Sequence, residues 1–219
     1  QENINLKKPL AVQLGEFVAA LRFEDMPPAV IDKAKAFVNH AVTVGMASFG
    51  APRPAAARRA VLKHERLGAS SIGAGQGATL WVDGTRVTLA GAAFANGVPI
   101  AVNNQCDSYH MLTHPGVLII PAGLATAEGE GRSGRELLTA LVAGYEVQCR
   151  CSRDFIPSTP AHGFRASPLY GILGCAATTA KLMGLDASQT VHAIALAASF
   201  AGSLIEGQRI GARDGDFAE

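Results

Sequence analysis

The chain has 219 residues, of which 48% are hydrophobic and 17% are charged, and its formal net charge is +1. This length can bury a large core in one domain, and the low charged fraction predicts extensive burial between helices and between subunits. Because the sequence contains no basic run interleaved with aromatic residues, nucleic acid is not expected as a partner, and a small molecule is.

Three helices are expected in the first third of the chain. Apolar residues recur at helical spacing over residues 9–22, and a Pro-Pro pair interrupts the pattern before a second helix from about Pro28 to Ser48. His40 lies among the apolar positions of this second helix, so we interpret it as a core histidine. Residues 54–67 have the pattern of an exposed amphipathic helix.

The next segment combines a glycine-rich run with a hairpin signal. The run GASSIGAGQGA, residues 68–78, lacks the Gly-Lys-Ser/Thr ending of a phosphate-binding loop, and no strand precedes it. We therefore expect a flexible connector there. Residues 79–90 alternate apolar and polar side chains around Asp83-Gly84, which predicts a β-hairpin with a tight turn.

Helices are expected for most of the remaining chain, over residues 91–104, 117–129, 134–153, 167–184 and 187–204. Capping signatures precede two of them, Ser133 with Glu136 in one case and Asp186 or Ser188 in the other. Alanine and glycine are abundant in these segments, and small residues permit close helix crossings. The predicted fold class is all-α, mostly a helical bundle, with one short β-hairpin near residues 79–90.

Chemistry-bearing residues concentrate in one short segment, CDSYHMLTHPG, residues 106–116. His110 and His114 are four residues apart, a spacing that places two metal ligands on one helix face. Only Asp107 is near enough in sequence to be a third ligand, and its spacing does not match, so we expect no metal. In the alternative that we favour, the Pro-Gly after His114 forms a rigid turn that directs one imidazole into a pocket.

The order of the motifs resembles that of the MmgE/PrpD family. AAFANGV is followed by the acidic motif, by HPG with an alanine-rich helix, by GRELLTALVAGYEVQ, by GF-x-x-S, and by MGLDASQTVHAIALAAS. The resemblance spans nearly all of residues 8–207. It implies a large helical domain and a smaller α+β lid, usually in a dimer, with small polycarboxylates bound between the two parts. It further implies removal of a proton next to a carboxylate, without a cofactor, in dehydration, decarboxylation or epimerisation.

The resemblance carries over unevenly to the individual site residues. Where the family has D-F-D-D-T, this chain has Asn104 in place of the first acid, Asp107 as the last acid and Ser108 as the hydroxyl residue. His114 matches the histidine of the HPG motif, and His110 fits a position that is often histidine. The expected carboxylate pocket is therefore retained only in part.

A further departure lies downstream, where the family has G-F-H-P. The chain has Arg165 at the position of that histidine, so a permanent cation replaces an imidazole. The lysine and histidine that the family places beyond residue 219 have no counterpart. We expect residues 1–219 to form a single helical domain, with the lid missing from this chain or supplied by another one.

The chemistry that the resemblance implies assigns roles to six residues. Proton removal needs a base together with donors or cations that hold the developing negative charge. We expect His114 to be the base, with Asp107 orienting an imidazole and Ser108 donating to a substrate oxygen. The predicted catalytic residues are thus His114, Asp107 and Ser108, and the predicted substrate-binding residues are Asn104, His110 and Arg165, of which Arg165 suits bidentate binding of a carboxylate.

Structural alternatives stay open for several of these residues. His114 could be a structural turn residue, Asp107 a helix cap, His110 a residue of the solvent-facing rim and Arg165 a surface arginine. The chain as a whole is predicted to be a lyase or isomerase acting on a small di- or tricarboxylate, in a homodimer or with a lid-bearing chain. The alternative is a non-catalytic carboxylate-binding or assembly subunit.

The sequence also gives expectations about compartment. No uninterrupted apolar stretch reaches the roughly 18 residues of a membrane span, so no membrane association is expected. The cysteines show no CxxC spacing and are interpreted as buried thiols in a reducing compartment, which favours the cytoplasm. Because the chain begins at Gln1 and not at methionine, export through a removed N-terminal signal stays open as an alternative.

Overall fold

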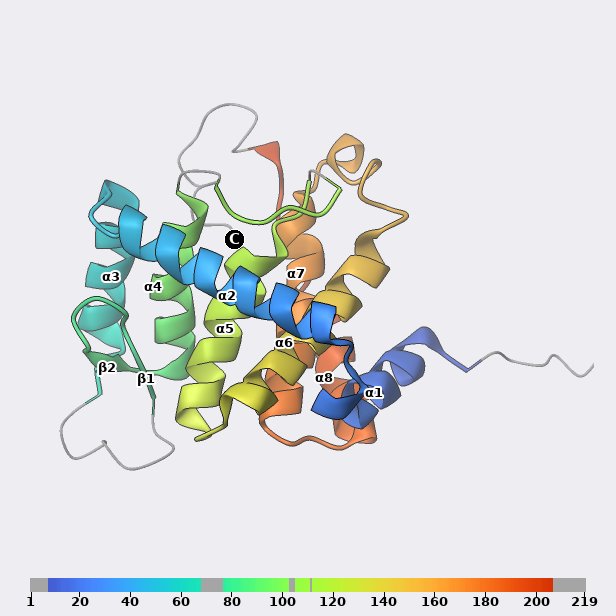
Figure 1. The fold of residues 1–219 in the computed structure, drawn as a ribbon. Helices are drawn as coiled ribbons and strands as arrows, with labels where there is room; N and C mark the ends of the chain where they lie inside the picture. Colours follow the sequence, from blue (N-terminus) through green and yellow to red (C-terminus); the bar gives the residue numbers. More distant parts are fainter. Residues whose placement is uncertain (1–7, 68–76, 103–104, 111, 207–219) are drawn as a thin grey trace, which may run out of the picture.

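The computed structural model describes residues 8–67, 77–102, 105–110 and 112–206 (Figure 1). Within these residues the chain forms eight α-helices, two short 3-10 turns and one two-stranded antiparallel sheet. The all-α fold class with one short hairpin is therefore confirmed. The elements are α1 (Leu10–Ala20), η1 (Phe23–Asp25), α2 (Pro28–Ser48), α3 (Pro52–His64), β1 (Ala78–Thr79), β2 (Arg86–Val87), α4 (Leu89–Ala101), α5 (Pro115–Gly129), α6 (Gly134–Ser152), η3 (Pro160–His162), α7 (Ala166–Leu182) and α8 (Ala187–Ser199).

Capping residues set where the helices begin. A proline is the first residue of α2, α3 and α5, where its missing N–H would have no intrahelical partner in any case. The Ser133 side chain accepts from the Glu136 N–H at the start of α6, and Asp186 accepts from the Gln189 N–H at the start of α8. Both capping signatures in the sequence are thus confirmed.

The hairpin is present but shorter than the alternating pattern predicts. Ala78 pairs with Val87 and Thr79 with Arg86, while the residues between them form the turn around Gly84, whose φ is +71°. Thr88 then caps α4 by accepting from the Gly91 N–H, so the helix begins at Leu89. Strand structure up to residue 90 was a wrong expectation, because the cap turns the chain into a helix first.

The last helix also ends earlier than predicted. α8 stops at Ser199, and the predicted extension to residue 204 is wrong. The segment that follows pairs instead with the residues before α7: the Arg165 N–H donates to the Ser203 carbonyl at 2.9 Å, and the Ile205 N–H donates to the Gly163 carbonyl at 2.9 Å. These bonds tie the end of the described chain to the start of α7.

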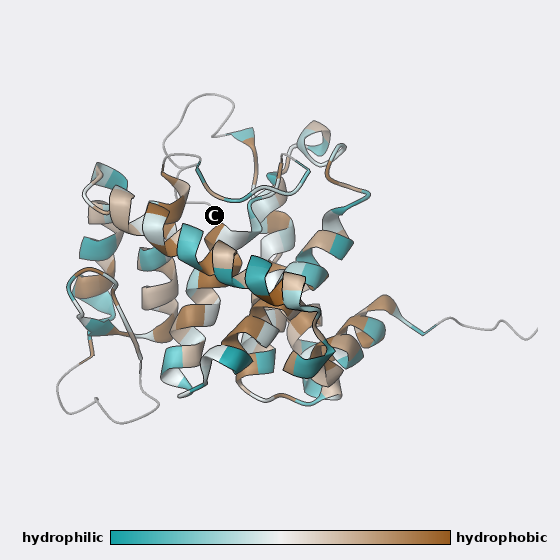
Figure 2. Cartoon of the chain, viewed as in Figure 1, coloured by the Kyte–Doolittle hydropathy of each residue, from teal (hydrophilic) through white to brown (hydrophobic). Residues whose placement is uncertain are grey.

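Helix α5 is the central element of the bundle (Figure 1). It packs against α4 on one side and against α6 and α7 on the other, while α1 and α8 pack together at one end. Figure 2 shows apolar and polar residues alternating along α2, which runs across the front of the bundle. The main core cluster lies between α2, α4, α5 and α6 and includes Ala41, Ile100, Ile119, Ile120 and Leu141.

Small residues allow α6 and α7 to approach closely, as the sequence predicted. A Cβ atom at Gly144 would lie 2.8 Å from the Gly174 carbonyl oxygen, and one at Gly174 would lie 3.0 Å from the Gly144 carbonyl oxygen. Both distances are tighter than almost all real Cβ contacts. Glycine is therefore needed at both positions for this helix crossing.

Candidate functional site

The candidate site is built on the loop of residues 105–114, which joins α4 to α5 and lies partly outside the described residues at Met111. Tyr109 and Thr113 form an antiparallel bridge, with N–H to carbonyl distances of 2.9 Å and 3.3 Å. The Thr113 hydroxyl, which is fully buried, also donates to the Tyr109 carbonyl at 2.8 Å. This closed turn fixes the backbone just before His114.

His110 lies at the outer end of this turn and faces solvent. Its φ is +49°, in the left-handed region that residues with a Cβ atom seldom adopt. The imidazole is exposed and packs edge-on against the Tyr109 ring, with 4.4 Å between ring centroids. His110 thus occupies a rim position, which was one of its two interpretations from the sequence.

Asp107 is held from two directions. Its Oδ1 atom accepts from the Gly116 N–H at 2.8 Å, in the first turn of α5, and its Oδ2 atom accepts from the Tyr145 hydroxyl at 2.7 Å. The carboxylate therefore caps α5 and is bonded to α6 at the same time. With both oxygens engaged, Asp107 is placed to fix the loop, and less suited to exchanging protons with a substrate.

His114 lies at the point where the loop becomes α5, as the N-terminal capping residue of that helix. Its N–H donates to the Ser167 hydroxyl of α7 at 3.1 Å, and its Nδ1 atom lies 3.0 Å from the Asp107 carbonyl oxygen. Because a carbonyl can only accept, the neutral ring must carry its proton on Nδ1, which leaves the Nε2 lone pair as the basic position. In this tautomer His114 could accept a proton at Nε2, and its predicted role as the base stays a prediction.

The remaining predicted residues are placed less completely. Arg165 is the residue immediately before α7 and is half-buried; because Ser167 bonds to His114, Arg165 and His114 lie at the same end of two adjacent helices. Ser108 is exposed, next to Asp107. Asn104 lies outside the described residues.

Sequence reasoning missed Tyr145, which comes from the middle of α6. Burial and the adjacent Asp107 carboxylate raise the pKa of Tyr145 well above its usual value, so the phenol stays protonated and donates. Its ring stacks on Phe37 of α2, with 5.4 Å between centroids. A signal did exist in the sequence, because a lone phenol in the apolar run LVAGYEV needs a buried acceptor.

His40 was also misjudged. It was expected in the core, but the residue is exposed, and its Nε2 atom lies 2.6 Å from the Gln105 carbonyl oxygen. The side chain therefore supports the start of the 105–114 loop from α2. Hydrophobic periodicity could not reveal this, because the partner carbonyl is distant in sequence.

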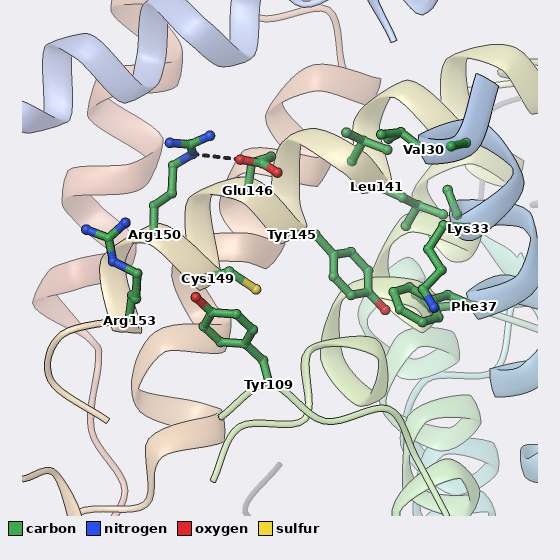
Figure 3. Close-up of a pocket in the computed structure, with 14 residues that line it drawn as sticks. Val30, Lys33, Phe37, Tyr109, Leu141, Tyr145, Glu146, Cys149, Arg150 and Arg153 are labelled. Carbon is green, nitrogen blue, oxygen red and sulfur yellow. Dashed lines mark hydrogen bonds and ion pairs between the residues drawn. The ribbon is translucent and has the colours of Figure 1, made fainter. Parts of the chain in front are cut away.

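A mainly apolar cavity of about 560 Å³ lies between α2 and α6 (Figure 3). Phe37, Tyr145 and Tyr109 form one part of its wall, and Cys149 faces it, with a thiol pKa raised to about 12 by burial. None of the five predicted site residues that the structure describes lines this cavity. Tyr145 connects the cavity to Asp107, because its ring lines the cavity and its hydroxyl donates to the Asp107 carboxylate.

Two features are absent from the described residues, a cluster of metal ligands and a membrane-spanning helix. Across residues 8–67, 77–102, 105–110 and 112–206, no three His, Cys, Asp or Glu side chains are grouped as metal ligands. No helix within the same ranges combines the length and apolarity required to cross a membrane.

Comparison with known proteins places these residues in a wider context. Residues 12–213 match the model of the MmgE/PrpD N-terminal domain. Similar proteins include a cis-aconitate decarboxylase-like protein, oryM, of Aspergillus oryzae, 28% identical over 210 residues that make up 91% of this chain and 42% of the relative. The cis-aconitate decarboxylase of Homo sapiens is 36% identical over 121 residues, 51% of this chain and 24% of that protein.

The cis-aconitate decarboxylase of Aspergillus terreus is 24% identical over 213 residues, which cover 93% of this chain and 41% of the relative. The chain therefore spans less than half the length of these relatives. The family match includes every predicted site residue from Asn104 to Arg165.

Proposed function

Because the chain belongs to the MmgE/PrpD family, we propose that it supplies the catalytic helical part of a lyase for a small di- or tricarboxylate. The relatives named as cis-aconitate decarboxylases favour a reaction of the dehydratase or decarboxylase type over an epimerisation. The observation that carries the proposal is the bond between His114 Nδ1 and the Asp107 carbonyl, because it leaves Nε2 as a base at the edge of the site.

In the proposed chemistry His114 both removes a proton from the substrate and returns one to it. Neutral Nε2 can remove a proton from the carbon next to a carboxylate, which prepares loss of a leaving group in a dehydration. Once protonated, the same ring can return a proton to the carbanion that loss of CO2 leaves. Asp107 is a positioning residue in this scheme, since both of its carboxylate oxygens are already bonded within the protein.

Arg165, Ser108, His110 and Asn104 are proposed to bind the carboxylates and oxygens of the substrate. Arg165 stands just before the first turn of α7, at the positive end of the helix dipole, which also favours an anion. A guanidinium binds a carboxylate through two parallel hydrogen bonds. Arg165→Ala is therefore expected to weaken polycarboxylate binding by about 2–4 kcal/mol.

We further propose that the protein pairs with a second copy or with another chain, and that this partner contributes to the site. Large apolar side chains are exposed near the C-terminal end of the described residues, including Leu196, Phe200 and Leu204 at 63%, 79% and 71%. Native mass spectrometry of the protein from its source is expected to show a dimer or a hetero-oligomer, and a lone monomer would refute this part of the proposal.

One experiment tests the function directly. The protein from its source, with any chain that accompanies it, is incubated with cis-aconitate and with citrate, and CO2 release and alkene absorbance are followed. We expect turnover of at least one acid, loss of turnover in His114→Ala with binding retained, and no effect of the matched control His192→Ala on the exposed face of α8.

A second candidate function is binding of a carboxylate without catalysis. It is suggested by Arg165, which stands where the family resemblance has a histidine. A fixed cation can hold a carboxylate but cannot exchange a proton at neutral pH. If the complete protein binds a polycarboxylate through Arg165 and turns over none, it is a carboxylate-binding subunit. The lyase proposal then fails.

A further inference from the structure

Tyr145 connects the middle of α6 to the loop that carries the proposed base. Its hydroxyl donates to Asp107 Oδ2 at 2.7 Å, while the other carboxylate oxygen accepts from the Gly116 N–H at 2.8 Å. The phenol and the amide thus hold one carboxylate between α6 and α5. A carboxylate with two such donors has little freedom to rotate.

The surroundings hold the bonded pair closely against the start of α5. A Cβ atom at Gly116 would lie 2.6 Å from Asp107 Oδ1 and 2.8 Å from the Tyr145 hydroxyl oxygen. The phenol ring also stacks on Phe37 of α2, with an angle of 21° between the ring planes. A side chain at position 116 would therefore displace Asp107 Oδ1 or the Tyr145 hydroxyl.

The same aspartate contacts the proposed base through its main chain. While the Asp107 carboxylate is fixed by Tyr145 and Gly116, the Asp107 carbonyl accepts from His114 Nδ1 at 3.0 Å. Fixing the carboxylate therefore restricts where the Asp107 main chain, and with it the carbonyl, can lie. The carbonyl in turn selects the tautomer of the imidazole.

We propose that Tyr145 is a positioning residue that, through Asp107, holds the His114 ring in the Nδ1–H tautomer with Nε2 free to accept a proton. The inference rests on the proposed function for its catalytic meaning, but the tautomer itself does not depend on any activity. Tyr145 touches neither substrate nor reacting atoms, and it acts only through the aspartate.

A purely structural role is the competing explanation, in which Tyr145 is a core phenol that has found an acceptor. Such a phenol would matter for stability and leave the His114 ring unchanged. Tyr170 of α7 provides a matched control, because it is half-buried like Tyr145 and its hydroxyl bonds to the Thr159 hydroxyl at 2.9 Å. Tyr170→Phe removes the corresponding phenol oxygen, whose hydrogen bond to Thr159 does not involve Asp107.

The test is 15N NMR of the protein labelled at histidine, recorded at a pH where imidazole is neutral. The His114 signals are assigned by their loss in His114→Gln. We expect wild type and Tyr170→Phe to show the Nδ1–H form almost alone, and Tyr145→Phe to show a mixture of both tautomers. Circular dichroism establishes that each variant is folded, and Tyr145→Trp serves as a second variant if Tyr145→Phe is not.

The outcomes separate the inference from the proposed function. An unchanged His114 tautomer in folded Tyr145→Phe overturns the positioning role, even if the protein is an active lyase. A changed tautomer in a protein that turns over no carboxylate supports the positioning role and refutes the function. If both hold, Tyr145→Phe is expected to lower kcat by up to about 100-fold with little change in KM, because a displaced base acts mainly in the transition state.

Discussion

The contact between α6 and α7 and the loop of residues 105–114 are held together in opposite ways. In the helix contact, backbones meet through Gly144 and Gly174, beside the buried side chains of Ile119, Gln148 and Thr178. In the loop, a few named hydrogen bonds fix residues that are only partly buried. The helix contact should therefore determine stability, whereas the loop should determine where one imidazole points.

Gly144→Ala tests the helix contact and should have the largest effect on stability. The added Cβ atom would lie 2.8 Å from the Gly174 carbonyl oxygen, so the helices must separate. We expect the free energy of unfolding to fall by about 1–3 kcal/mol, measured by urea denaturation. Gly134→Ala at the start of α6 is the control, because a Cβ atom there meets nothing within 4 Å.

Equal stability of the two variants would contradict this account of the contact. For Gly134→Ala the expectation is a change within about 0.5 kcal/mol or a slight gain, since alanine limits the unfolded chain more than glycine does.

Gly116→Ala tests the loop and should cost less stability but more function. Its Cβ atom would displace both Asp107 Oδ1 and the Tyr145 hydroxyl, so two hydrogen bonds are lost. We expect about 1–2 kcal/mol of lost unfolding free energy together with loss of turnover. If the variant retained full turnover, the loop would not control the base.

Tyr145→Phe is expected to have the smallest effect on stability, and in alkaline solution that effect should depend on pH. Burial and Asp107 raise the pKa of Tyr145 in the folded protein, so above about pH 10 the unfolded chain ionises this phenol while the folded chain does not. The folded state then binds more protons, and stability falls as pH rises. The contribution of Tyr145 is fully present below about pH 10.

The comparison to make is the difference in unfolding free energy between wild type and Tyr145→Phe. It should stay constant from about pH 7 to 9 and then shrink by about 1 kcal/mol per pH unit above pH 10, by the linkage relation. Buried thiols such as Cys149 contribute the same slope to both proteins and cancel. A constant difference up to about pH 11 would contradict the assigned environment of Tyr145.

Features with partners nearby in the sequence were easier to predict than features whose partners are distant in the sequence. The helices and the caps at Ser133 and Asp186 follow from periodicity and from local hydrogen bonding, so they were predictable. The strand limits were missed although the cap at Thr88 is local, and the end of α8 was not predictable because it depends on pairing between the distant segments 163–165 and 203–205. Local patterns do not contain such partners.

The candidate site divides in the same way. His114 and Asp107 were predictable because their motif is contiguous and resembles that of a family. The bonds that give them their roles come from Tyr145 in α6 and Ser167 in α7, tens of residues away. The tautomer of His114 could not be derived from the sequence, because it depends on the Asp107 carbonyl that the fold places beside Nδ1.

The central claim is that His114 transfers a proton at the carbon next to a substrate carboxylate. The most direct measurement is NMR of deuterium incorporation at that carbon, in D2O, with cis-aconitate and citrate as probes and with any chain that accompanies the protein in its source. We predict incorporation by wild type and by His192→Ala, and none by His114→Ala. Absence of incorporation in wild type, or its persistence in His114→Ala, would contradict the account.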